Sequence, residues 1–273
     1  MHKTFILFIT SLIYFKCQSQ PETQREISKK TKAHQERIIQ QHVYDCANRI
    51  NYNIMMKEYQ DCLDGGLKKD STVAYLWQQK AMPYFKAKKY EVGMEYINKA
   101  VIYDAKNWLP YRAFIKCIFV KSYREAIKDF EECISKWGDG YRMDHTYSFY
   151  IGLSFLQLNE FDNAENYFKH TITEQKNRFN EAHHLDLFYY AITKYELKKY
   201  DEAINIFDEA IGQYPEFSDA IYYKALCFYK LSKPVEEYQD LINKAEEFAK
   251  RGYTINEDNA VYEQYPYQVK WKK

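Results

Sequence analysis

One helical pattern recurs along the chain and constrains its fold more than any other feature does. It consists of an aromatic residue, a small residue three positions later, a large apolar residue four positions after that, and another small residue three further on. The instances are Tyr90-Gly93-Ile97-Ala100, Tyr123-Ala126-Phe130-Cys133, Phe161-Ala164-Phe168-Thr171 and Tyr200-Ala203-Phe207-Ala210. These spacings place the side chains on one face of a helix, where the small residues let a neighbouring helix approach closely.

A second helical run precedes three of these segments. Another small residue lies twelve positions before the first small residue of the pattern, at Ala81, Gly152 and Ala191. A short polar link such as Asn159-Glu160 separates the two runs, and acidic or capping residues follow in the first turn of the second run. The sequence therefore predicts a repeated unit of helix, tight turn and antiparallel helix.

The phrases Ile151-Gly152, Phe161-Asp162-Asn163-Ala164 and Lys199-Tyr200-Asp201-Glu202-Ala203 resemble tetratricopeptide repeats, which are 34 residues long. The resemblance implies an all-α superhelix (a TPR solenoid) of about five to six antiparallel helix pairs, with the first helix of each pair lining a concave wall. In this phase the array covers 40–251, as units 40–73, 74–107, 108–141, 145–178, 184–217 and 218–251. Residues 20–39 form a linker or a first helix. Residues 252–273 form a C-terminal capping tail that covers the last repeat or folds back into the groove.

Residues 1–19 have the character of an export signal. A basic start precedes the apolar run Phe5 to Phe15, which as a helix covers about half of the ~30 Å hydrocarbon core, so no integral membrane span is expected. Two processing routes stay open. Cys17 stands where a bacterial lipoprotein signal places its acylated cysteine, although Lys16 replaces the small residue of that pattern. A cut ahead of Gln20 would release a soluble form instead. We therefore expect an exported protein, either a periplasmic or outer-membrane lipoprotein or a secreted form, touching the membrane only through an N-terminal lipid anchor.

The charge balance and the absence of catalytic motifs exclude several classes of function. Lys and Arg total 39 against 38 Asp and Glu, which gives no electrostatic footprint for a nucleic-acid partner. The sequence has no H-E-x-x-H, G-x-S-x-G or G-x-G-x-x-G motif. We therefore predict neither an enzyme nor a cofactor.

Cysteines and histidines give little sign of a metal site. The cysteines after Cys17 are odd in number and have no C-x-x-C spacing, which signals neither a disulfide framework nor a zinc site. Cys133 and Cys227 occupy small apolar positions and are predicted to be buried free thiols. Four histidines lie near two enlarged links between repeats: His145, His170, His183 and His184. They could converge in space, but their spacing matches no known ligand set, so no metal site is predicted.

Three consecutive first helices carry aromatic and aliphatic side chains close to the small residue. By the resemblance, these positions point into the concave groove. The predicted ligand-binding residues are Phe149, Tyr150, Leu153, Phe188, Tyr189, Ile192, Tyr222, Tyr223 and Leu226. A contiguous apolar strip usually marks a contact surface, although the same residues would also suit a core, and the tyrosine-rich tail could cover them.

These features favour a non-enzymatic protein- or peptide-binding scaffold of the bacterial cell envelope that binds through its groove. The first alternative is a structural subunit of an outer-membrane assembly or secretion complex, contacting its partners through the convex face or the edges. The second is a glycan-binding or glycan-acting envelope protein that uses the aromatic strip as a sugar platform. Binding of chaperone C-termini is disfavoured, because the matching surface offers aromatic and aliphatic side chains instead of Lys, Arg and Asn.

Overall fold

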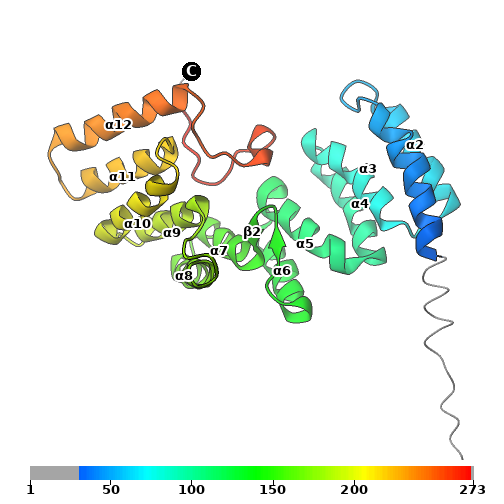
Figure 1. Ribbon diagram of the computed structural model, residues 1–273, viewed down its shortest axis with the longest axis horizontal. Coiled ribbons are helices and arrows are strands. Elements are labelled where there is room, and N and C mark those ends of the chain that lie inside the picture. Colours follow the sequence, from blue (N-terminus) through cyan, green and yellow to red (C-terminus); the bar gives the residue numbers. More distant parts are fainter. Residues whose placement is uncertain (1–30, 272–273) are drawn as a thin grey trace, which may run out of the picture.

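The computed structural model describes residues 31–271, which are mostly helical (Figure 1). A helix over 31–39 continues as the π-helical η1 (Gln40–Tyr44), followed by the short 3-10 helix η2 (Ala47–Arg49). The longer helices are α2 (Met56–Lys69), α3 (Ala74–Lys86), α4 (Tyr90–Tyr103), α5 (Ala105–Ile115), α6 (Tyr123–Trp137), α7 (Tyr147–Gln157), α8 (Phe161–Phe179), α9 (His184–Glu196), α10 (Tyr200–Gln213), α11 (Ser218–Lys230) and α12 (Val235–Lys250). The π-helical η3 (Lys116–Val120) extends α5, and η4 (Asp258–Val261) lies in the tail.

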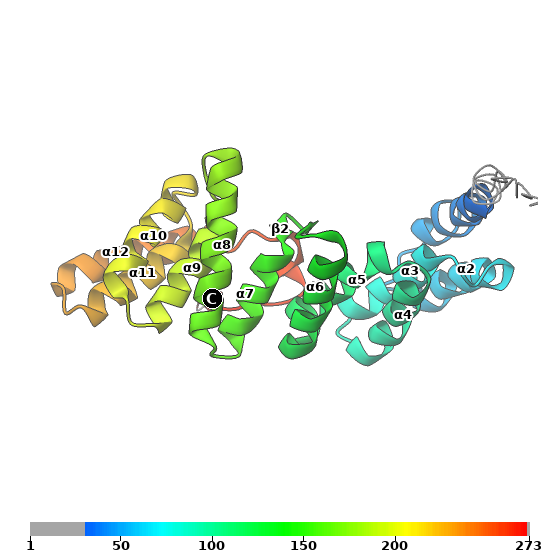
Figure 2. The same ribbon diagram turned by 90° about the horizontal axis from the view of Figure 1, so that it is seen from below.

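Successive helices pack as pairs, α3 with α4 and so on to α11 with α12. The second helix of each pair also contacts the first helix of the next, as α4 does with α5 and α8 with α9. The result is an elongated, curved array rather than a compact bundle (Figures 1 and 2). This arrangement confirms the predicted all-α solenoid of stacked helix pairs.

The turns within the pairs share one backbone conformation. The left-handed residues of these turns are Lys88, Lys121, Asn159, Lys198 and Ser232. In the turn between α9 and α10, the amide of Lys199 donates to the carbonyl of Lys194 at 2.9 Å, which closes the helix in a Schellman motif. Because the same turn recurs, each pair folds back at a similar angle and the pairs can stack.

The interior follows the recurring pattern of large and small side chains. Phe130, Phe168 and Phe207, one on each of three second helices, are fully buried. Gly152 on α7 lies under Phe168, where an added Cβ would come within 3.3 Å of the ring. The small residues therefore allow the close helix approach that the sequence predicts.

A disulfide joins Cys46, which precedes η2, to Cys62 in α2, with Cα atoms 5.8 Å apart. The expectation of no disulfide is wrong for this pair. The two cysteines are 16 residues apart and an odd number of others follows, so neither count nor spacing reveals the bond. Cys117, Cys133 and Cys227 are free and buried, which confirms the prediction for the latter two.

The sequence predicts two enlarged links between pairs, but in the structure only the first of them is longer than the other links between described pairs. The link after α6 contains an antiparallel hairpin of β1 (Tyr141–Arg142) and β2 (His145–Thr146). The other is shortened by extra turns of α8, which runs on to Phe179. Within residues 31–271, no helix is both long and apolar enough to cross a bilayer.

Candidate functional site on the concave face

The nine predicted groove residues lie on α7, α9 and α11. The six on α7 and α9 have 0% of their surface exposed, whereas Tyr222, Tyr223 and Leu226 on α11 are half-buried. The rings of Phe149 and Tyr189 meet edge to face, with centroids 5.7 Å apart. In this structure the six are core residues, and only the three on α11 remain partly exposed. A role in ligand binding stays a prediction for all nine.

Part of this burial comes from the second helices. The ring of Phe168 on α8 lies 5.8 Å from that of Phe149 and 6.4 Å from that of Tyr189, measured between centroids. Phe188 meets Phe207 of α10 in the same way, at 6.1 Å. Aromatic rings at these positions therefore fill the seams within and between pairs, which is the core alternative that the sequence left open.

The C-terminal tail supplies the rest of the cover. After α12 the chain turns at Gly252 and runs back across the concave side of the array, past α9 and α7 towards the N-terminal pairs (Figures 1 and 2). Of the two arrangements expected for the tail, the structure has it folded back into the groove. The tail then turns and runs back, so that it forms a loop (the tail loop) whose two ends, near residues 255 and 269, lie close together on α11.

Asp219 at the start of α11 binds the outgoing and the returning part of the tail. Its carboxylate accepts the amide of Ile255 at 3.0 Å and that of Val269 at 2.7 Å. Burial raises the pKa of Asp219 to about 6, although these two amides favour the ionised form. One acidic side chain therefore fixes the base of the tail loop on the array.

Tyrosines that the sequence assigned to a ligand contact the tail instead. The hydroxyl of Tyr189 donates to the carbonyl of Pro266 at 2.9 Å. The ring of Tyr223 packs on Tyr267 and that of Tyr222 on Trp271, with centroids 6.0 and 5.4 Å apart. The groove thus binds an extended segment through its main chain and its aromatic side chains.

At the far end of the tail loop, the carboxylate of Glu263 lies in a pocket formed by Tyr90, Lys88 and Lys121 (the socket of Glu263). Its carboxylate accepts a hydrogen bond from Tyr90 of α4 and lies 3.8 Å from the ammonium of Lys88 and 4.0 Å from that of Lys121. Lys121 also donates to the carbonyl of Gln264 at 3.0 Å. Lys88 and Lys121 occupy the left-handed turn positions of two successive pairs. The same turn geometry therefore directs both ammonium groups toward Glu263.

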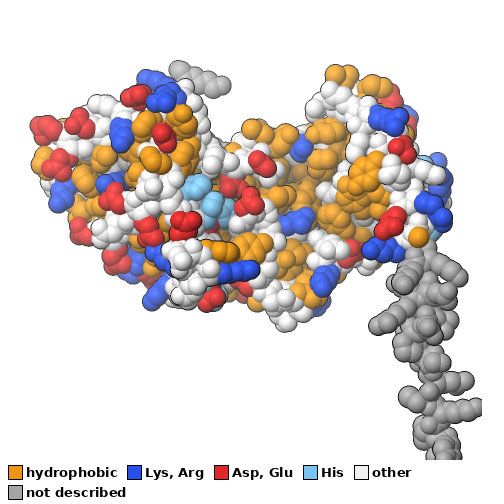
Figure 3. All heavy atoms as spheres, viewed as in Figure 1, with side chains coloured by type: hydrophobic (Ala, Val, Ile, Leu, Met, Phe, Trp, Pro, Cys, Tyr) orange, Lys and Arg blue, Asp and Glu red, His pale blue; other side chains and the backbone are white. Residues whose placement is uncertain are grey.

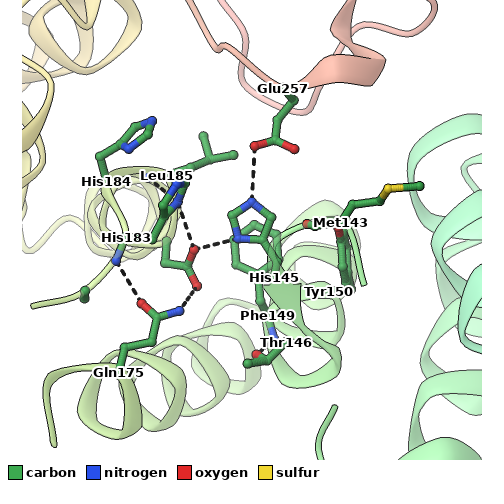
Figure 4. A network of polar contacts seen from close by, with 12 residues as sticks. Met143, His145, Thr146, Phe149, Tyr150, Gln175, His183, His184, Leu185 and Glu257 are labelled. Atoms are coloured by element: carbon green, nitrogen blue, oxygen red, sulfur yellow. Dashed lines mark hydrogen bonds and ion pairs between the residues drawn. The ribbon is translucent and has the colours of Figure 1, made fainter. Parts of the chain in front are cut away.

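Midway along the tail, a polar network lies beneath Glu257 (Figure 4). His145 of β2 is fully buried, with Nδ1 2.7 Å from Asp186 Oδ2 and Nε2 3.3 Å from Glu257 Oε1. Gln175 of α8 donates to Asp186 Oδ1 at 2.9 Å and accepts the amide of His183 at 2.9 Å. The network joins the fourth and fifth helix pairs to each other and to the tail.

Charge in this network is shared between one imidazole and two carboxylates. Burial alone would lower the pKa of His145, but Asp186 and Glu257 raise it to about 10. Burial would raise the pKa of Asp186, yet His145 and His183 lower it to about 2. Burial lowers the pKa of His184 to about 4, so this ring is neutral at pH 7. A protonated His145 therefore faces an ionised Asp186.

Three of the four histidines near the enlarged links do converge. The ring centroids of His145 and His183 are 5.1 Å apart and those of His183 and His184 are 4.2 Å apart, whereas His170 lies exposed on α8. One ligand atom from each of His145, His183 and Asp186 lies within 4.8 Å of the other two, a set that could hold a metal ion. Asp186 is not among the residues predicted from the sequence, although an acid within the apolar run of α9 is a usable signal.

The tail leaves the N-terminal part of the array uncovered. A cavity of about 570 Å³ lies there between the helix at 31–39 and the start of α5. Tyr75 and Trp108 stack beside it, and Arg142 lies over the ring of Tyr111 with its Nε buried and unbonded within the described residues. Figure 3 shows apolar side chains gathered on this face between the tail and the N-terminal helices.

Comparison with known proteins identifies the repeat. Residues 191–252 match the family model for the tetratricopeptide repeat. No curated protein sequence matches the chain. Among solved structures, PilW, described as a widely conserved type IV pilus biogenesis factor, superposes with a TM-score of 0.59 at 14% identity and covers 83% of this chain and 98% of its own.

Two other solved structures are similar in fold. A tetratricopeptide repeat protein from Parabacteroides merdae gives a TM-score of 0.59 at 15% identity, covering 80% of this chain and 84% of its own. MamA from Desulfovibrio magneticus gives 0.55 at 10% identity, covering 65% and 96%. At these identities the likeness concerns the fold alone. Residues 191–252 therefore belong to the tetratricopeptide repeat family, and the stacked helix pairs of the described chain have the fold of a tetratricopeptide repeat solenoid.

Proposed function

We propose that this protein is a non-enzymatic scaffold of the bacterial cell envelope that binds an extended segment of a partner protein along its concave face. The tetratricopeptide fold itself indicates a protein–protein interaction scaffold. The finer statement depends on one observation, the seating of the chain's own tail in the groove.

The tail contacts have the character of peptide recognition. Tyr189 and Lys121 donate to the tail carbonyls of Pro266 and Gln264, and Asp219 accepts tail amides. Contacts to main-chain groups do not depend on side-chain identity, so they would serve another extended segment equally well. Specificity would come from the pockets for acidic and aromatic side chains, such as the socket of Glu263. A partner segment with acids and tyrosines at similar spacing could take the place of the tail.

Two features support a place outside the cytoplasm. The export signal predicted at 1–19, with Cys17, lies outside the described residues, so it stays a sequence prediction. The disulfide between Cys46 and Cys62 is independent of it, and stable disulfides form mainly in oxidising compartments. Both fit an exported protein. A mature N-terminus at acylated Cys17 would be measured as added mass on the intact native protein.

One relative in fold carries a peptide site. YrrB, described as a TPR protein with an unusual peptide-binding site, superposes with a TM-score of 0.50 at 16% identity and covers 69% of this chain and 92% of its own. The superposition shows a similar fold and does not locate a peptide-binding site in this chain. The proposal therefore depends on the tail contacts rather than on this likeness.

Site-specific photocrosslinking in the native envelope tests the proposal. A photoreactive residue at Tyr222 in the groove should capture a partner, whereas the same residue at exposed Asn205 on α10 should not. An excess of synthetic peptide 253–271 should suppress the capture, because it competes for the groove. Equal capture at both positions, or capture that the peptide does not reduce, would contradict binding along the concave face.

A structural subunit of an envelope assembly is the second candidate. The observation that favours it is the complete burial of the six predicted groove residues on α7 and α9. A groove closed permanently by its tail would leave the convex face and the edges for partners. In that case a stable complex would form with undiminished yield when Tyr189 and Lys121 are replaced, and crosslinks would come from Asn205 instead of Tyr222.

A further inference from the structure

Two histidines and one aspartate from neighbouring helix pairs meet beneath the tail. His145 comes from β2, ahead of α7, and His183 and Asp186 come from the start of α9. Asp186 Oδ2 lies 2.7 Å from His145 Nδ1 and 3.6 Å from His183 Nδ1. All three ligand atoms fall within 4.8 Å of one another, and His145 and Asp186 are almost fully buried.

We propose that His145, His183 and Asp186 form a binding site for one Zn²⁺ ion. Imidazole nitrogen and carboxylate oxygen are common zinc ligands, and in a tetrahedral site with bonds of about 2.0–2.1 Å neighbouring ligand atoms lie roughly 3.3 Å apart. The two distances at Asp186 bracket that value, so shifts of less than about 1 Å would bring its two pairs to zinc geometry. Three protein ligands leave the fourth position to water.

The surrounding hydrogen bonds are those that orient metal ligands. A metal-bound histidine usually donates its other ring N–H to a carboxylate, and here His145 Nε2 faces Glu257 at 3.3 Å. Gln175 fixes two of the ligands, since it donates to Asp186 Oδ1 and accepts the backbone amide of His183. Figure 4 shows Glu257 pointing toward the ring of His145 and Gln175 lying beside His183. Glu257 and Gln175 are thus positioning residues.

An ion can reach the site and find charge balance there. The side chain of His183 is 37% exposed and lines a cavity of about 310 Å³ together with Gln175 and Glu181. An ionised Asp186 can only accept a hydrogen bond, so the 2.7 Å contact with its Oδ2 requires a proton on His145 Nδ1. On binding, Zn²⁺ takes the place of that proton, which passes to solvent, and the two carboxylates of Asp186 and Glu257 compensate the ion.

A bound ion would connect three parts of the chain. It would bridge the fourth and fifth helix pairs directly, and it would hold the tail through the bond from His145 to Glu257. This inference is independent of the proposed function, because the site needs no partner. It also differs from the sequence expectation of no metal site, since the ligands come together only through the stacking of two pairs.

Cobalt and zinc titrations of the full, untagged chain test the site. Co²⁺ should give the visible absorption bands of a low-coordinate complex, saturating at one ion per chain, and Zn²⁺ should abolish them. His183→Ala should lose this saturable binding, whereas His170→Ala, an exposed histidine on α8, should retain it. Glu257→Gln should weaken binding about 10–100-fold as the loss of an orienting partner. Circular dichroism would confirm that each variant is folded.

A measurement on the unaltered chain does not depend on any variant. X-ray absorption of the zinc-loaded protein should show scattering from two imidazoles among the zinc ligands. Zn²⁺ should also raise the unfolding temperature of the wild type, because it binds the folded state. The inference is overturned if His170→Ala removes binding as fully as His183→Ala, or if the zinc spectrum lacks the two imidazoles.

Discussion

The hydroxyl of Tyr189 donates to the carbonyl of Pro266 at 2.9 Å, and both groups are buried. The tyrosine belongs to the first helix of the fifth pair and the proline to the C-terminal tail. A residue that the sequence placed in a ligand-binding groove therefore binds a segment of its own chain. This contact links the fold, the tail and the proposed function.

Replacing Tyr189 by Phe should loosen the tail. The change leaves the ring in place but removes the donor to a buried carbonyl, which costs about 1–3 kcal/mol. Hydrogen exchange of the tail amides should speed up while the exchange of α9 stays slow. Tyr190→Phe on the same helix is the matched control, since Tyr190 is half-buried and its ring faces Lys194 of its own helix, with the ammonium 5.1 Å from the ring centroid. Unchanged exchange in Tyr189→Phe would contradict the role of this bond.

The pH dependence of stability should carry a contribution from Asp219. Burial raises the pKa of Asp219 from 3.8 to about 6, so between these values the folded chain binds more protons than the unfolded chain. Its contribution to the free energy of unfolding therefore falls as pH rises from about 4 to 6 and is constant above that. Asp219→Asn removes the titration. The free energy of unfolding of the wild type minus that of Asp219→Asn should fall as pH rises across this window. A rise in this quantity would contradict the assignment.

Two glycines should respond in opposite directions to alanine. A Cβ on Gly93 would lie 2.4 Å from Cε1 of the buried Phe85, so Gly93→Ala should destabilise the chain by about 1–3 kcal/mol through overpacking. A Cβ on Gly212 meets nothing within 4 Å, so Gly212→Ala should stabilise α10 by about 0.5–1 kcal/mol. Chemical denaturation measures both, and equal effects would show that Gly93 is not tightly packed.

Cysteine chemistry should separate the bonded pair from the buried thiols. Burial raises the pKa values of Cys117, Cys133 and Cys227 to about 12, so alkylation followed by peptide mapping should leave them unmodified until the chain unfolds. Replacing Cys46 and Cys62 by Ser should cost about 3 kcal/mol, as expected for a loop of this size. The loss should be confined to the first helix pair, since contacts in a repeat array are between neighbours.

The helical architecture was predictable because its signal is local. The spacing of Phe168 from Ala164, and of Phe207 from Ala203, follows from the geometry of one helix packed on its neighbour. The functional surface could not be predicted in the same way. The contacts of Tyr90 with Glu263 and of His145 with Glu257 join residues 173 and 112 positions apart, and no periodicity specifies such pairs.

The aromatic residues of the strip illustrate the same limit. Phe149 and Phe188 have the spacing of groove residues and also of core residues, and only the position of the second helices and the tail decides between them. The pairing of Cys46 with Cys62 likewise depends on how η2 meets α2 in space. The sequence shows which residues are present, but it does not show which residues lie beside them in the folded chain.

Recognition of extended segments by the concave face can be tested by adding the tail as a separate peptide. A protease site placed at the exposed Gly252 would allow the tail to be cut and removed after folding. Labelled peptide 253–271 should then bind the trimmed array saturably, one to one. Lys121→Ala or Tyr189→Phe should weaken this binding, whereas Asn205→Ala should not. A trimmed array with unchanged circular dichroism that does not bind the peptide would contradict the claim that this concave face recognises extended segments.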